Sequence, residues 1–224
     1  YKCSITLDPS LATTVGQLQI SMSVGITGAE TNAFNGDGTS GIYIWGSQFE
    51  ENSYSTSYIK TTGTAQTRVA DTATGSGNST VINSSEGVLY AEISALANDL
   101  SFREITISDG TNNNRIELRF GNNSNEIGLV VRSIDSTVVS IFGTTFYDVT
   151  NFNKVAVNYK LNDVSLWING VKINTDTSAI MPINLSELAF DSGAGSNDFY
   201  GKTKSVQVYT TALSDAELTT LTTI

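Results

Sequence analysis

The chain contains no histidine and a single cysteine, Cys3. A lone cysteine cannot form an intrachain disulfide. Structural zinc sites and Ser–His or Cys–His catalytic pairs need residues that are missing here. Charged residues are also scarce, at 15% of the chain, compared with about 25% in an average globular protein. Calcium stays open as a ligand, because it binds oxygen atoms.

Most of the charge that is present is negative, and the formal net charge is −10. This charge argues against a nucleic acid as partner, since its phosphates would be repelled, and against an anionic membrane surface. It also disfavours a strongly anionic polysaccharide unless a divalent cation bridges the two. No apolar run is long enough to span a membrane and no signal peptide is apparent, so we expect no membrane insertion.

The clearest structural signal is the stretch 154–174, in which apolar and polar residues alternate as in a strand with one buried face. Two dipeptides suited to two-residue hairpin turns divide it: Asn162-Asp163 and Asn169-Gly170. The turns therefore predict a three-stranded meander with its aliphatic residues on one face. The predicted facing pairs next to the turns are Leu161 with Val164 and Ile168 with Val171.

Trp167 falls on the opposite face of this meander, predicted across from Asn158 in one strand and Lys172 in the other. An aromatic ring between an amide and an ammonium group is typical of a sugar-binding platform, because sugars stack on rings and hydrogen-bond to polar groups. The alternative is that a loop or another subunit covers Trp167, since exposed apolar patches mark several kinds of contact.

From residue 71 onward, short strands follow one another at the spacing of a β-sandwich. A single helix is predicted at the C-terminus, with Ser214 as N-cap, Glu217 closing a capping box, and Leu213 and Leu218 as a hydrophobic staple. This helix should end near Thr223. The predicted strands cover residues 79–82, 87–93, 102–108, 115–120, 127–132, 138–142, 186–190 and 202–209, besides the meander.

The N-terminal part contains three further candidate strands, at residues 2–7, 16–24 and 41–46. Residues 36–68 resemble a signature of bacteriophage tail-fibre and related virion proteins, where it ends a jelly-roll domain similar to carbohydrate-binding modules. The resemblance implies that residues 1–57 are the C-terminal part of such a domain and that 58–70 form an extended connector. Lys60 departs from the pattern, which usually has proline there. The matching residues are Trp45-Gly46, Gln48, Glu50, Ser57-Tyr58-Ile59 and Thr67-Arg68.

Residues 71–224 resemble the laminin-G-like branch of the concanavalin A-like lectin/glucanase superfamily. The resemblance implies an all-β, antiparallel β-sandwich of the concanavalin A-like jelly-roll type with a short C-terminal helix. Such domains mostly bind glycans or proteins. The matching pieces are EGVLYAEI (86–93), VSLWINGVKI (164–173) and FYGKTKSVQVYTTALSDAEL (199–218).

Two arginines and a glutamate share one face of a predicted strand: Arg115, Glu117 and Arg119. This face resembles a motif of alginate-lyase-type enzymes on the same fold, but the other motifs of those enzymes are missing. We therefore keep Arg115 and Arg119 as candidate glycan-binding residues, with a solvated ladder of charges as the alternative. Glu86 and Glu92 lack the tight spacing of the catalytic carboxylates in laminarinase-type relatives.

Asp109, Asp191 and Asp198 lie in loops rich in glycine, asparagine and serine, and they are the candidate ligands for Ca²⁺. In such loops, aspartate more often caps turns.

These observations together predict a non-catalytic, lectin-like module of a virion tail fibre or adhesin that attaches to a host-surface glycan. Its expected partners are other virion chains, including copies of itself, and its expected location is the extracellular surface of the virion. The alternatives are a structural or decoration module that makes protein contacts, and a polysaccharide depolymerase or lyase. The candidate glycan-binding residues are Trp167, Asn158, Lys172, Arg115 and Arg119.

Overall fold

The computed structural model describes residues 38–39, 43–50, 55–67, 76–144 and 147–224. The chain divides into two units, Tyr1–Val69 and Ala70–Ile224. The predicted strands at 2–7 and 16–24 lie outside the described residues, as do the first two residues of the one at 41–46. Its described part forms no strand. The assignment of residues 1–57 to a jelly-roll domain stays a prediction.

Two polar residues of the N-terminal signature organise a local loop. The Gln48 side chain accepts a hydrogen bond from the backbone N–H of Ile59 at 2.8 Å and donates one to the carbonyl of Ser57 at 3.3 Å. Glu50 accepts from the backbone N–H of Thr56 at 2.7 Å. The glutamine and the glutamate of the signature therefore hold the backbone of this loop in place.

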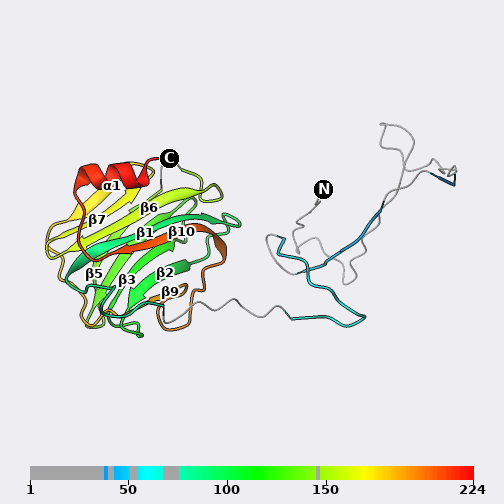
Figure 1. The fold of residues 1–224 in the computed structure, drawn as a ribbon, viewed down its shortest axis with the longest axis horizontal. Coiled ribbons are helices and arrows are strands. Elements are labelled where there is room, and N and C mark those ends of the chain that lie inside the picture. The colour runs from blue at the N-terminus through cyan, green and yellow to red at the C-terminus, as the bar shows by residue number, and fades with distance from the viewer. Residues whose placement is uncertain (1–37, 40–42, 51–54, 68–75, 145–146) are drawn as a thin grey trace. The chain divides into compact units, whose positions relative to one another are not determined.

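The second unit is a sandwich of two antiparallel five-stranded sheets and one helix (Figure 1). This architecture confirms the predicted fold class. The first sheet has the order β10(Gly201–Tyr209), β1(Glu86–Ala95), β6(Asn153–Lys160), β7(Asp163–Ile168) and β8(Val171–Asp176). The second sheet has the order β5(Ser136–Gly143), β4(Ile127–Ser133), β3(Arg115–Phe120), β2(Arg103–Ser108) and β9(Glu187–Ala189).

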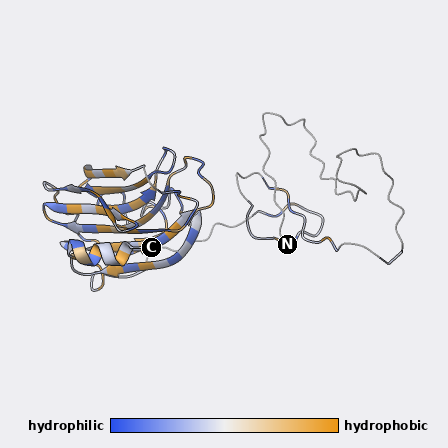
Figure 2. Ribbon diagram, turned by 90° about the horizontal axis from the view of Figure 1, so that it is seen from above, coloured by the Kyte–Doolittle hydropathy of each residue, from blue (hydrophilic) through white to orange (hydrophobic). Residues whose placement is uncertain are grey.

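The main core lies between the sheets and is formed by apolar side chains of both. Figure 2 shows hydrophobic and polar positions interspersed along the strands. Leu89 and Leu166 of the first sheet and Leu118 and Leu129 of the second belong to this core and are fully buried. The alternate residues of each sheet point outward, so each sheet has an outer face of its own.

The meander forms with the predicted faces but with a different turn between its first two strands. Lys160 pairs with Asp163 and Tyr159 with Val164, so the prediction that Leu161 faces Val164 is wrong. Leu161 lies in the turn with Asn162, whose φ of 58° supplies the left-handed conformation. With this turn, each residue of the first strand pairs with a residue two positions away from the predicted one. Because side chains alternate with period two, each side chain of these two strands still points to the predicted face of the sheet.

The second turn of the meander is as predicted, since Ile168 pairs with Val171. Val171 is nevertheless exposed, in the outermost strand of its sheet. One predicted strand, at 79–82, is wrong, because the backbone N–H groups of Val81 and Ile82 bond to the carbonyl of Asn78 in a turn.

Helix α1(Asp215–Thr222) packs on the outer face of the first sheet (Figure 1). Ser214 caps its N-terminus, and the Ser214–Glu217 capping box forms as predicted. A second, smaller apolar cluster lies under the helix: Val88, Tyr90, Ala156, Trp167 and Leu218. No helix within the described ranges is long and apolar enough to span a membrane.

Candidate functional site

The structure does not form the predicted sugar platform around Trp167. The indole points away from the main core, as predicted, but α1 covers it and only 4% of its surface is exposed. Across the sheet it faces Ala156 rather than Asn158. Trp167 is therefore a packing residue between the first sheet and the helix.

The two predicted partners of Trp167 hold the helix in place. Asn158 is buried, and its side-chain oxygen accepts a hydrogen bond from the backbone N–H of Leu213 at 3.0 Å. Lys172 forms an ion pair with Asp215 at 3.0 Å and lies 5.3 Å from the centre of the Trp167 ring. The face predicted to bind sugar is thus the attachment site of α1.

The outer face of the second sheet gathers a different set of polar and aromatic side chains. One row crosses four neighbouring strands and pairs Phe142 with Gly128, Gly128 with Arg119, and Arg119 with Glu104. The next row places Glu117 beside Thr106. Because all of these residues share one parity along their strands, their side chains point to the same outer face.

Arg119 lies between two aromatic rings on this face. Its guanidinium carbon is 4.8 Å from the centre of the Phe102 ring and 5.1 Å from that of Phe142. A Cβ at Gly128 would come 2.2 Å from the Phe142 ring, so glycine allows this ring to lie over the strand. Both rings are 37% exposed and the Arg119 side chain is 20% exposed.

Next to this exposed group, two arginines flank a fully buried carboxylate. Glu117 is 0% exposed and forms ion pairs with Arg115 Nε and, at 3.4 Å, with Arg119 Nη1. Arg115 also donates to the carbonyl of Ser192 at 3.1 Å. The alternative of a solvated ladder is wrong, because burial and these contacts fix the charges in place.

The loop after β9, residues 190–198, covers the buried half of this face. Thr106 Oγ1 donates to the carbonyl of Asp191 at 2.6 Å. The backbone N–H of Glu104 donates to the carbonyl of Asn197 at 3.1 Å, and the Asn197 amide donates back to Glu104 Oε1 at 2.9 Å. Phe102, Arg119 and Phe142 stay partly exposed outside the part of the face that the loop covers.

Glu104 is 1% exposed, and its second carboxylate oxygen, Oε2, has no hydrogen-bond partner among the described residues. Burial raises the pKa of Glu104 to about 7, and the nearby charge of Glu117 acts in the same direction. The amide of Asn197 and the two guanidinium groups oppose the shift. Glu104 therefore titrates near neutral pH.

Two of the three candidate calcium ligands, Asp109 and Asp191, cap turns. Asp109 accepts hydrogen bonds from Thr111 and Asn114, and Asp191 accepts one from the N–H of Gly193. Asp198 accepts from the hydroxyl of Tyr200 at 3.2 Å. Within the described ranges, no three acidic or thiol side chains form a group that could hold an ion. Calcium binding stays a prediction.

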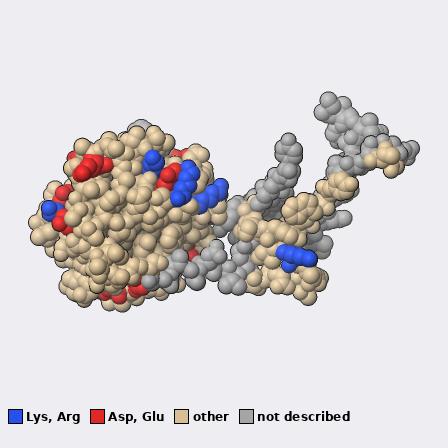
Figure 3. Space-filling view, in the orientation of Figure 1, with Lys and Arg blue, Asp and Glu red and all other residues tan. Residues whose placement is uncertain are grey.

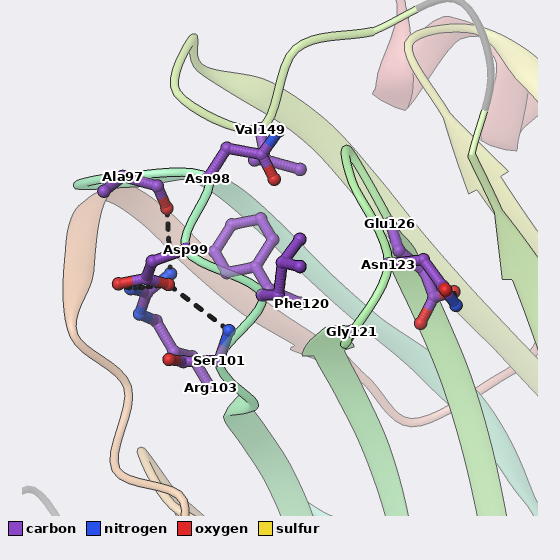
Figure 4. Close-up of a pocket in the computed structure, with 11 residues that line it drawn as sticks. Ala97, Asn98, Asp99, Ser101, Arg103, Phe120, Gly121, Asn123, Glu126 and Val149 are labelled. Carbon is purple, nitrogen blue, oxygen red and sulfur yellow. Dashed lines mark hydrogen bonds and ion pairs between the residues drawn. The ribbon is translucent and has the colours of Figure 1, made fainter.

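Two hollows elsewhere in the sandwich lack the features of a sugar site. Figure 4 shows a cavity of about 10 Å³ in which Arg103 forms an ion pair with Asp99 at 2.6 Å. It has room for about one water molecule. A larger open groove of about 750 Å³, between residues 79–85 and 181–185, has no charged or aromatic side chain in its lining.

Sequence reasoning identified Arg115 and Arg119 but missed Phe102, Phe142 and Glu104. Phe102 and Glu104 have the spacing of one strand face, which is a usable signal. The approach of Phe142 to Arg119 depends on pairing across β4, and the burial of Glu104 depends on a loop with no recognisable motif.

The two antiparallel sheets packed face to face, with one short C-terminal helix, define a β-sandwich of the jelly-roll class. The Laminin_G_3 family model, described as the concanavalin A-like lectin/glucanases superfamily, matches residues 89–219. This match covers more than half of the chain, and the protein belongs to that family. No curated protein matches the sequence.

Solved structures of sialidase-associated proteins share the fold. The CBM40 of the Ruminococcus gnavus IT-sialidase, bound to α2,3-sialyllactose, is 20% identical, with 68% of this chain and 94% of that chain covered and a TM-score of 0.55. The leech intramolecular trans-sialidase is 19% identical, with 69% of this chain and 27% of that chain covered and a TM-score of 0.50. At these identities the likeness establishes the fold.

Proposed function

We propose that residues 70–224 form a carbohydrate-binding module whose site is the Phe102–Arg119–Phe142 group. The observation that supports the proposal is an arginine held between two half-exposed phenyl rings on an open sheet face. The rings can stack on the apolar faces of sugar units, and the partly exposed guanidinium group of Arg119 can donate to their oxygen atoms.

The ligand class we propose is a glycan with an acidic sugar unit. A guanidinium group binds carboxylates through charge-assisted hydrogen bonds. The structurally similar CBM40 was solved with sialyllactose, whose sialic acid has a carboxylate. The net charge of −10 opposes this ligand at long range, but exposed charges farther away than about 8 Å are largely screened at physiological salt.

Binding without catalysis fits the carboxylates of this face better than hydrolysis does. Glycosidases place two carboxyl groups on either side of the bond that they cleave. Here Glu117 and Glu104 are both buried, the first between two arginines and the second beneath the loop of residues 190–198. A depolymerase or lyase would release reducing ends from the host polysaccharide, and we expect none.

The proposed setting is a virion tail fibre or adhesin, on the extracellular surface of the virion, where several copies of the chain assemble with other virion chains. Its support is the resemblance of residues 36–68 to a signature of such proteins. A single exposed site of this size would bind a host glycan weakly, and repetition in an oligomer would raise the overall affinity. A structural or decoration module is the alternative, and it would bind no glycan at millimolar concentration.

The test is calorimetric titration of the chain with 3′-sialyllactose, and with lactose as the neutral control. Arg119→Ala should weaken binding by about tenfold or more, since a hydrogen bond to a charged group contributes about 1.5–3 kcal/mol. The matched control is Arg132→Ala, because Arg132 lies on β4 of the same sheet and pairs with the exposed Asp135. Unchanged affinity of Arg119→Ala would remove this site.

A further inference from the structure

The row that forms the proposed sugar site ends in a buried acid. Glu104 of β2 lies directly across from Arg119 of β3. One of its oxygens is bonded to Asn197 at 2.9 Å, and the other has no hydrogen-bond partner among the described residues. A buried carboxylate with an unpartnered oxygen is costly when ionised, so this position favours the protonated form.

Charged residues of the neighbouring strands and of the covering loop lie around Glu104. Glu117 contributes a second buried carboxylate. Arg119, which is partly exposed, forms an ion pair with it. When both acids are ionised, the two carboxylates balance the guanidinium groups of Arg115 and Arg119. The other charged residues on this face or in its covering loop are Arg132 of β4, Glu187 of β9, and Asp191 and Asp198 of the loop.

We infer that Glu104 is a proton switch for the proposed site, so that an acidic sugar binds at Arg119 together with a proton on Glu104. The module would then hold acidic glycans more tightly in mildly acidic surroundings than in alkaline ones. This inference rests on the proposed function, because it concerns the same arginine and the same class of ligand.

The direction of the effect follows from the charges. Protonation of Glu104 leaves two guanidinium groups opposite one carboxylate, and the resulting positive charge attracts the carboxylate of a sugar. By reciprocity, a bound sugar carboxylate raises the pKa of Glu104 above its value of about 7 in the free protein. Histidine cannot cause a pH dependence in this range, because the chain has none.

The experiment is calorimetric titration of the full chain with 3′-sialyllactose at pH 6.0 and pH 8.0 at constant ionic strength. We expect affinity about fivefold higher at the lower pH, which corresponds to a pKa of about 7 in the free protein and a value about one unit higher in the bound protein. Repeating the titration near neutral pH in two buffers with different ionisation enthalpies should show net proton uptake on binding. The sugar carboxylate stays ionised throughout and cannot supply this signal.

Glu104→Gln should bind with an affinity that no longer changes between these pH values, while Glu187→Gln, on the same face, should keep the change. Thermal unfolding of both variants checks that they fold. If Glu104→Gln does not fold, proton uptake by the unmodified chain still decides the question. Binding that is equal at both pH values, with no proton uptake, would overturn the switch alone. Absence of binding at every pH would overturn the proposed function as well.

Discussion

Trp167 is expected to stabilise the sandwich rather than to touch a ligand. Its indole is buried under α1, and its Nε1–H donates to Ser165 Oγ at 3.1 Å. Replacing Trp167 with alanine should lower the free energy of unfolding by about 3–5 kcal/mol, because the cavity under the helix cannot fully collapse. Urea unfolding, followed by circular dichroism, measures this change.

The matched control is Trp45→Ala, since Trp45 is 81% exposed and its ring meets the ring of Tyr58 edge to face. Its free energy of unfolding should change by no more than about 0.5 kcal/mol. A Trp167→Ala variant that keeps its stability but loses sugar binding would contradict the structural role and restore the platform that the sequence predicted.

The sequence pattern predicted the face of the sheet to which Trp167 points. It could not predict which other part of the chain packs on that face. Period-two alternation correctly placed Trp167 outside the main core, and residue type made Arg119 a candidate site residue. Neither signal could show that α1 lies on Trp167 or that the side chain of Asn197 reaches Glu104. Both contacts join residues far apart in the chain, and local pattern contains no information about such distances.

The C-terminal helix depends on its N-cap more than on its length, because an eight-residue helix is marginal by itself. Ser214 and Glu217 satisfy each other's backbone groups, and these bonds hold the pKa of Glu217 below its usual value. Ser214→Ala should reduce stability by about 1 kcal/mol. The part that comes from ionised Glu217 is present above its unfolded-state pKa and disappears as the pH falls through the folded-state value.

Thr220→Ala is the control for the cap, because Thr220 lies on the exposed side of the same helix and bonds only to the preceding turn at the carbonyl of Ala216. Its unfolding midpoint in urea should stay close to that of the unmodified chain. Equal midpoints for Ser214→Ala and Thr220→Ala would show that the capping box contributes nothing measurable.

Elements were more predictable than the connections between them. The capping box predicted the start of α1 at Ser214, and alternation predicted β3 with both of its ends. The turn at Leu161–Asn162 was misplaced by one residue, because two adjacent residues, Asn162 and Asp163, both suit a turn. The segment 79–82 has the composition of a strand but lacks a partner for one, and it folds into a turn instead.

The two sheets of the molecule have different roles on their outer faces. Helix α1 packs on the outer face of the first sheet over Tyr90 and Trp167, while the second sheet keeps aromatic and charged groups at the surface beside the loop after β9. Figure 3 shows that most of the side of this unit in view is neither acidic nor basic. On the second sheet, a partly exposed arginine lies between two rings.

Residues 70–224 are expected to fold without residues 1–69, because both sheets, the core between them and α1 all belong to the second unit. The start of the unit is attached by the pairing of Ser76 with Leu188, whose backbone bonds are 3.3 and 2.6 Å long. Calorimetry of this fragment should show one cooperative transition, as expected for a single domain of this size. Its affinity for 3′-sialyllactose should equal the affinity per site of the full chain.

The control fragment ends at residue 212 and so lacks α1. It should expose the apolar cluster around Trp167 and bind a hydrophobic dye or aggregate, since apolar patches of this kind associate. If residues 70–224 behaved in the same way, the N-terminal unit would be part of the folding unit. If they folded but bound sugar more weakly per site than the full chain does, the site would extend beyond the second sheet.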